Sequence, residues 1–215
     1  IEVSDTAEVV RPGEPAPAIT PEQFGRRVGE YLDSNRFDYG NVGIVVGDKT
    51  RRCGYPEYLP VLLEQLRQRG AEPASVAVYI AYGTHAPQDE EKCREVYGAS
   101  YETHRFVHHR CDQSGVFADL GTTEAGTPAR IRRDVLDAGM LITFGAVSHH
   151  YFAGFGGGRK LLFPGLGQKD AVYANHGLFL DRPHGRLHPG CRPGVLAGNP
   201  VAEDLAQIES RFRVD

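Results

Sequence analysis

The chain has 215 residues, which is long enough for one large domain or two small ones with a substantial core. Its apolar fraction of 40% and charged fraction of 24% are typical of a folded globular protein, and a formal net charge of −4 argues against a nucleic-acid-binding protein. No apolar run is long enough to cross a bilayer, and the N-terminal segment lacks the features of a signal peptide. We therefore expect a cytoplasmic protein that binds neither nucleic acid nor membrane.

The pattern of apolar residues predicts strands that alternate with helices. An extended, Pro-rich and acidic segment leads into a helix over 21–35, which begins after Thr20 as its N-cap. The later predicted elements are a buried strand 41–48, a helix 55–70, a buried strand 75–83, a helix 87–98, a third strand 101–110, a helix 126–139, a strand 140–147, and two helices, 168–180 and 199–212.

This alternation predicts an α/β domain, Rossmann-like, with a mainly parallel sheet flanked by helices. We assign residues 41–215 to this domain and residues 1–40 to a lead-in and a helix that packs on it. The four cysteines are widely spaced and form no CxxC pair, so we expect four free thiols and no structural zinc site; they are Cys53, Cys93, Cys111 and Cys191.

Three of the predicted strands end in polar sequences, GDKTR, YGTH and VSHH. Ligands of open α/β sheets bind outside the carboxyl ends of the strands, and parallel strands place those ends on one edge. We therefore expect an active site at this edge, formed by residues that converge from the three strand ends: Asp48, Arg51, His85, His149 and His150.

Each of these polar residues also has a structural interpretation. Asp48 can orient a histidine, and Arg51 can hold a carboxylate or phosphate, or else Asp48 caps the next helix and Arg51 is solvated. His85 has the near-neutral pKa of a general acid or base, or it is a polar loop residue bonded to the backbone.

Further candidates follow the last of these strands. The run FGGGRK matches neither the P-loop nor the dinucleotide fingerprint, but it places Lys160 on a glycine-lined loop, where a desolvated amine can bind an anion or form a covalent bond. His176 in a predicted helix is a candidate metal ligand, although a lone helical histidine is more often structural. We interpret the histidines of VHHRCD, residues 107–112, as a solvated strand end.

Taken together, these segments resemble the N-terminal domain of the nickel-pincer lactate racemase family. The resemblance covers about residues 41–207, and six motifs in the family's order carry it: GDKTR, YGTHAP, GTTEAGTP, SHHYFAGFGGGRKLLFPG, ANHG and RPGVLAGNPVAEDL. It implies an enzyme that racemises or epimerises a small 2-hydroxy acid, lactate or a relative. Family members also carry a C-terminal domain, which we expect to be absent from this chain.

The resemblance implies a cofactor and its attachment. The family's nickel-pincer nucleotide is a pyridinium-3,5-bisthiocarboxylic acid mononucleotide that holds nickel between two sulfur arms and is supplied by cofactor-synthesis proteins. By position, Lys160 would form the covalent link to it and His176 would be the fourth nickel ligand. A loop segment would contact the cofactor through Asp48, Lys49, Thr50 and Arg51.

The resemblance also implies catalytic roles. His85 and His150 would exchange the hydroxyl proton on opposite sides of the substrate, and Arg51 would bind its carboxylate. The residue types fit this chemistry, because moving a hydride to a planar 2-keto acid and back needs an electron sink, a base on each side and a cation. Two alternatives stay open: a non-catalytic module that binds a nucleotide or anion, and a zinc-dependent hydrolase.

Overall fold

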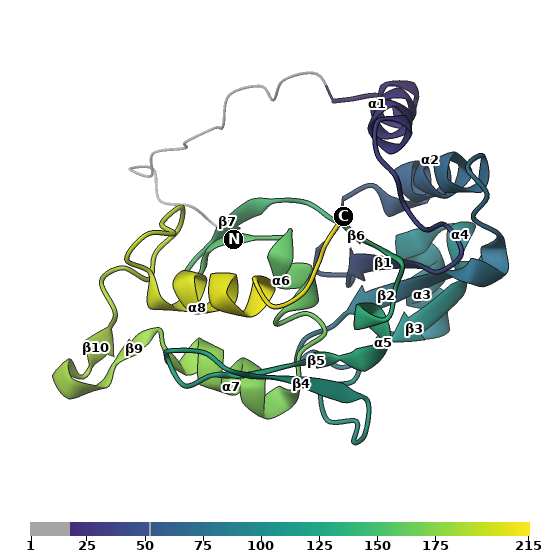
Figure 1. Cartoon of the computed structure of the whole chain (residues 1–215). Coiled ribbons are helices and arrows are strands. Elements are labelled where there is room, and N and C mark those ends of the chain that lie inside the picture. Colours follow the sequence, from purple (N-terminus) through teal and green to yellow (C-terminus); the bar gives the residue numbers. More distant parts are fainter. Residues whose placement is uncertain (1–17, 52) are drawn as a thin grey trace.

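The computed structural model describes residues 18–51 and 53–215, so most of the predicted lead-in lies outside the described residues. Figure 1 shows a sheet with helices on one side of the molecule and a second group of helices and hairpins on the other. The sheet has four strands in the order β3-β2-β1-β6, and all of its pairings are parallel. Its strands are β1 (Val42–Gly47), β2 (Val76–Ala81), β3 (Arg105–His108) and β6 (Met140–Phe144).

One face of the sheet packs against helices, as the sequence predicts. The first helix starts with a capping box, in which the Thr20 side chain accepts from the Gln23 N–H and the Gln23 side chain accepts from the Thr20 N–H. This helix packs on the next helix in the chain and stays on the outside of the domain. The helices on this side are α1 (Pro21–Asp33), α2 (Tyr55–Arg67), α3 (Glu90–Tyr97) and α4 (Ser100–Thr103), with a 3₁₀ turn at Pro73–Ser75.

The central strand has no polar side. All six residues of β1 are buried, because apolar side chains cover both faces of the sheet. Ile44 belongs to the core under the helices, whereas Val45 packs on the opposite face with Leu162 and its neighbours. The sheet therefore presents its functional groups at its edge and not on a face.

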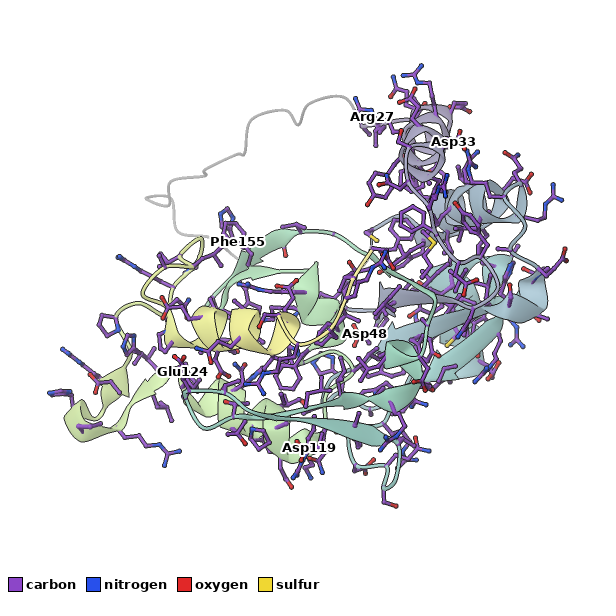
Figure 2. The ribbon with its side chains drawn as sticks, in the orientation of Figure 1. Arg27, Asp33, Asp48, Asp119, Glu124 and Phe155 are labelled. Atoms are coloured by element: carbon purple, nitrogen blue, oxygen red, sulfur yellow. The ribbon has the colours of Figure 1, made fainter. Side chains whose placement is uncertain are left out.

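A second core lies beyond the sheet, around helices α7 and α8. Figure 2 shows Asp48 between the sheet and these helices, whereas Asp119 and Glu124 lie out on a long hairpin. The elements of this region are β4 (Phe117–Thr122), β5 (Pro128–Arg132), α5 (Arg133–Leu136), β7 (Ser148–His150), β8 (Gly154–Gly156), α6 (Arg159–Leu162), α7 (Lys169–Gly177), β9 (Leu180–Asp181), a 3₁₀ turn at Arg182–His184, β10 (Arg186–Leu187) and α8 (Pro200–Glu209).

The predicted helix over 126–139 is wrong. Residues 128–132 form β5, which pairs antiparallel with β4, and only four residues after it are helical. Ala129 and Ile131 are fully buried and Arg130 between them is half-buried, which is the two-residue period of a strand. The predicted strand over 101–110 is also shorter, since its first residues belong to α4.

The structure also bears on the expectations of four free thiols and of no membrane-spanning helix. All four cysteines are free thiols. Among the described helices, none combines the length and the apolar character that crossing a membrane requires.

Candidate functional site

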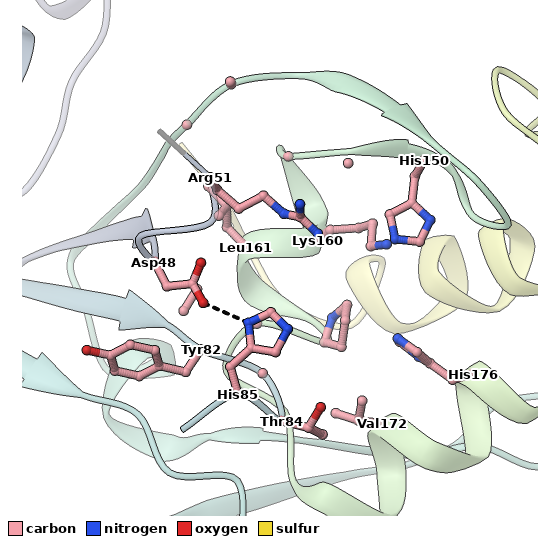
Figure 3. Close-up of a pocket in the computed structure, with 18 of the residues that line it drawn as sticks. Asp48, Arg51, Tyr82, Thr84, His85, His150, Lys160, Leu161, Val172 and His176 are labelled. Carbon is pink, nitrogen blue, oxygen red and sulfur yellow. Dashed lines mark hydrogen bonds and ion pairs between the residues drawn. The ribbon is translucent and has the colours of Figure 1, made fainter. Parts of the chain in front are cut away.

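A cavity of about 320 Å³ lies where the carboxyl ends of β1 and β2 face the segment after β6. Figure 3 shows the side chains that line it. They include six of the residues singled out from the sequence: Asp48, Arg51, His85, His150, Lys160 and His176. Residues more than a hundred positions apart thus line one cavity, and four of the five residues of the strand-end argument, all but His149, are among them.

Three of the expected residues lie outside this cavity. Lys49 and Thr50 are exposed and do not line it, although Thr50 hydrogen-bonds to the Asp48 carboxylate in its wall. His149 is exposed and stacks on Phe155, with the ring centroids 5.3 Å apart. Of the histidine doublet, only His150 faces the cavity.

We call Asp48, Arg51 and His85 the sheet wall. Strand β1 is held at its end by two buried tyrosines, since Gly47 donates its N–H to the Tyr55 hydroxyl at 2.6 Å and accepts from the Tyr97 hydroxyl at 2.8 Å. Asp48 follows immediately, so its position is fixed by these bonds to the strand end.

The Asp48 carboxylate orients His85. The two side chains meet at 2.7 Å between Oδ2 and Nδ1, and the carboxylate is almost fully buried whereas the imidazole is about half exposed. Asp48 Oδ1 also accepts from the backbone N–H and the hydroxyl of Thr50, at 2.9 and 2.6 Å. An ionised carboxylate only accepts, so Nδ1 carries the proton and the other ring nitrogen faces the cavity (Figure 3).

The structural alternative for Asp48 is wrong, because Gly54 is the N-cap of the following helix. Arg51 forms a tight turn with Asp48 through its backbone N–H, and its side chain extends across the cavity toward Lys160 (Figure 3). It is exposed and makes no ion pair with a carboxylate in the described part of the chain. A free guanidinium at a cavity rim is suited to bind a carboxylate or phosphate.

We call His150, Lys160 and His176 the loop wall, because all three come from the segment that follows β6. Gly157 has a φ of +82°, and a Cβ there would lie 2.1 Å from the Ala146 carbonyl oxygen. Only glycine fits this approach, which brings Lys160 in α6 against the strand end. His150 ends β7, and its Nδ1 accepts from the Ala153 N–H at 3.2 Å.

The loop wall favours the neutral form of its bases. Burial, followed by repulsion from Arg51 and Arg159, lowers the pKa of Lys160 to about 8. Burial and repulsion from Lys160 lower the pKa values of His150 and His176 to about 4. At pH 7 both imidazoles are therefore neutral and the amine has a substantial unprotonated fraction.

Phe152 is a site residue that the sequence reasoning missed. Its ring centroid lies 4.6 Å from the His150 ring and 5.1 Å from the His176 ring, and Lys160 Nζ lies 5.6 Å from the same centroid. One buried aromatic ring thus touches every base of the loop wall and supplies much of the apolar surface that desolvates them. Its only signal in the sequence is its place two residues after His150.

The loop wall can hold a metal ion only if a bound cofactor supplies the metal-coordinating atoms that the protein lacks. In the described residues, no group of three His, Cys, Asp or Glu side chains is arranged to hold a metal. Burial and the charge of Lys160 keep the imidazole of His176 neutral, and its Nδ1 is buried without a hydrogen-bond partner among the described residues. A neutral imidazole is a metal ligand for borderline ions such as nickel.

The interpretation of VHHRCD as a solvated strand end is wrong for His109. This residue is fully buried, and its Nε2 bonds the carbonyl of Gly167 at 3.1 Å. The bond ties the end of β3 to the turn that leads into α7, the helix of His176. His108 is half-buried and bridges two tyrosine hydroxyls.

Comparisons with known proteins identify relatives of this chain. Residues 29–187 match the family model described as the lactate racemase N-terminal domain. A lactate racemase of Thermoanaerobacterium thermosaccharolyticum is 31% identical over 167 residues, and one of Lactiplantibacillus plantarum is 30% identical over the same length. Each alignment covers 77% of this chain but 38% of the relative, so the chain spans well under half of these enzymes.

Solved structures show the same fold. The structure of the lactate racemase apoprotein from T. thermosaccharolyticum superposes with a TM-score of 0.77 and 26% identity, and covers 91% of this chain and 47% of that one. A crystal structure of a Thermotoga maritima protein gives a TM-score of 0.72 at 20% identity, covering 89% and 47%, and supports the fold alone. The sequence resemblance is confirmed: the chain belongs to the lactate racemase N-terminal domain family.

Proposed function

We propose that this domain carries the cofactor and most of the reacting groups of an enzyme that racemises or epimerises a small 2-hydroxy acid, lactate or a relative. The observation that supports the proposal most strongly is the content of one cavity. It brings the amine of Lys160, the neutral imidazole of His176 and the hydrogen-bonded pair of Asp48 and His85 around the same space. The proposal concerns the whole enzyme, since the chain spans 38% of the curated relatives.

The loop wall suits a nickel-pincer nucleotide. A partly unprotonated Lys160 is suited to form the covalent link, and His176 offers the one protein nitrogen that a three-donor pincer leaves open. Such a group supplies a reversible hydride acceptor when bound. In this proposal, cofactor-synthesis proteins act on the domain as transient partners.

The remaining groups act on the substrate. The free guanidinium of Arg51 binds the carboxylate in a two-point contact. The unprotonated ring nitrogen of His85 accepts the hydroxyl proton, and Asp48 stabilises the imidazolium that forms. Removing that proton allows the carbon to release its hydride and become planar.

A second base is needed for the mirror-image substrate. His85 belongs to the sheet wall and His150 to the loop wall, so they approach a bound molecule from different sides (Figure 3). His150 is neutral at pH 7 and can accept a proton. With one base on each side, the hydroxyl group of either enantiomer can be deprotonated. When the hydride returns to the planar carbon, the carbonyl oxygen can take back its proton from the base on the corresponding side.

The test is to produce the full-length protein together with cofactor-synthesis proteins. We expect a covalent mass increase on the peptide that contains Lys160, about one nickel per chain, and interconversion of D- and L-lactate or of a related 2-hydroxy acid. The adduct without turnover of any 2-hydroxy acid would support the non-catalytic binding module instead. Stoichiometric zinc without an adduct would support the hydrolase, for which no three-ligand group exists in the described residues.

A further inference from the structure

Gln88 is a buried polar residue whose side chain connects two loops. It lies three positions after His85 in the segment that follows β2, and it is 6% exposed. Its Oε1 accepts from the backbone N–H of Lys49 at 3.0 Å, and its Nε2 donates to the sulfur of Cys93 at 3.4 Å. Both ends of the amide are used, so its orientation is fixed.

The bond to Lys49 joins the same two loops as the pair of Asp48 and His85. Lys49 directly follows Asp48, and Gln88 belongs to the segment that carries His85. The imidazole of His85 is about half exposed, so packing alone does not hold it. Its place depends on the carboxylate and on the distance between the two loops.

The loop of Gln88 is anchored from the side away from the cavity. The backbone N–H of Gln88 donates to the Tyr82 hydroxyl at 3.3 Å, and that hydroxyl bonds His108 Nδ1 at 3.0 Å. The other ring nitrogen of His108 bonds the Tyr101 hydroxyl at 3.1 Å. Figure 3 shows the Tyr82 hydroxyl pointing away from His85, so this chain of bonds supports the loop from behind.

We infer that Gln88 is a positioning residue that holds the loop of Asp48 where its carboxylate orients the His85 imidazole. Its role in turnover rests on the proposed function, in which His85 is a base. Its effect on the geometry of His85 does not depend on that function. A displacement of about 1 Å at a reacting group can lower a rate about a hundredfold, so one hydrogen bond between loops is enough to matter.

The variant Gln88→Met removes both hydrogen bonds and nearly keeps the side-chain volume. The matched control is Gln207→Met, because Gln207 Oε1 accepts from the backbone N–H of Glu124 at 2.9 Å, outside the cavity lining. Imidazole nitrogen NMR on the full chain reports which nitrogen of His85 carries the proton. Should Gln88→Met not fold, Gln88→Asn keeps the amide but is one methylene too short to reach Lys49.

We expect the Gln88 variant to lose the Nδ1-protonated form of His85 in favour of a mixture of tautomers, while Gln207→Met leaves the wild-type signals. In the cofactor-loaded full-length enzyme, kcat should fall about 10- to 100-fold with the Lys160 adduct and the KM nearly unchanged. Wild-type His85 signals in the Gln88 variant would overturn the inference. If the wild-type enzyme does not racemise any 2-hydroxy acid, the proposed function fails, and the NMR comparison still decides the role of Gln88.

Discussion

The two walls of the cavity control nitrogen bases in opposite ways. On the sheet wall, His85 keeps contact with solvent and is paired with the buried carboxylate of Asp48. On the loop wall, His150, Lys160 and His176 are half-buried around the buried ring of Phe152, and burial lowers their pKa values. A hydrogen-bonded partner fixes the direction of a base, whereas burial fixes its protonation state.

This difference matches the tasks proposed for each wall. A group that takes and returns a substrate proton benefits from a partner that stabilises its charged form, as Asp48 does for His85. Groups that bind a metal or form a covalent bond must be unprotonated first, which burial favours without a hydrogen-bonded partner. In the proposed function, Lys160 and His176 of the loop wall therefore serve attachment and metal binding, whereas His85 of the sheet wall transfers a proton. His150 is the exception, because it would transfer a proton without a carboxylate partner.

The largest effect should come from the loop wall. We expect Lys160→Ala to abolish covalent attachment of the cofactor, because no other amine lines the cavity among the described residues. Intact mass after production with cofactor-synthesis proteins measures this. The control is Lys169→Ala, which removes an exposed amine outside the cavity lining and should leave the adduct in place. An unchanged mass shift in Lys160→Ala would contradict the assignment.

The sheet wall should behave in the opposite way. We expect His85→Ala to retain the adduct and to lower kcat for racemisation by about 10²- to 10⁴-fold, the contribution of a general acid–base group. His184→Ala is a matched control, because His184 pairs with Asp181 at 2.8 Å in the same manner but lies outside the cavity lining. Equal racemisation rates in the His85 variant and the wild type would contradict the proposed role of His85 as a base.

A titration can test the burial of Lys160 directly in the unmodified chain. A pKa of about 8 makes its neutral fraction at pH 7 on the order of a hundredfold larger than that of a free lysine. We expect its trace acylation, followed by peptide mass spectrometry, to level off above about pH 8. Arg51→Met removes a repelling charge and should raise that midpoint. A Lys160 midpoint near that of free lysine would mean that the loop wall does not desolvate the amine.

Much of this site can be predicted from the sequence, because the residues that line the cavity belong to local sequence patterns. The apolar runs of β1, β2 and β6 are long and rich in β-branched residues, and a parallel sheet brings their carboxyl ends together. That argument alone places Asp48 and His85 side by side. The glycines before Lys160 mark a close backbone approach for a similarly local reason.

The residues that support or complete the site cannot be predicted from the sequence, because their places depend on contacts between distant segments. Strand β5 is recognised only through its partner β4, and each is too short to be identified alone. The bond of Gln88 to Lys49 depends on the spacing of two loops, and the central place of Phe152 depends on three elements meeting. Nothing local in the sequence reveals the contact of His109 with Gly167, so the sequence predicts a surface position for a residue that is buried.

His109 is a buried base outside the cavity, and substituting it should give the smallest of the expected effects. Burial, then repulsion from Arg132, lowers its pKa to about 4, although it lines no part of the cavity. Between pH 6.5 and 4 the unfolded chain binds a proton at this position and the folded chain does not, so the free energy of unfolding falls as the pH falls through this range.

The variant His109→Gln keeps a donor for the Gly167 carbonyl and removes the titration. We expect the difference in unfolding free energy between wild type and variant to change by about 2 kcal/mol between pH 6.5 and 4, with the wild type losing more stability. Urea unfolding at several pH values measures it, and carboxylates common to both proteins cancel in the difference. Parallel pH profiles would mean that the folded protein binds a proton at His109 as readily as the unfolded chain does, so that burial and the charge of Arg132 together do not keep this base neutral.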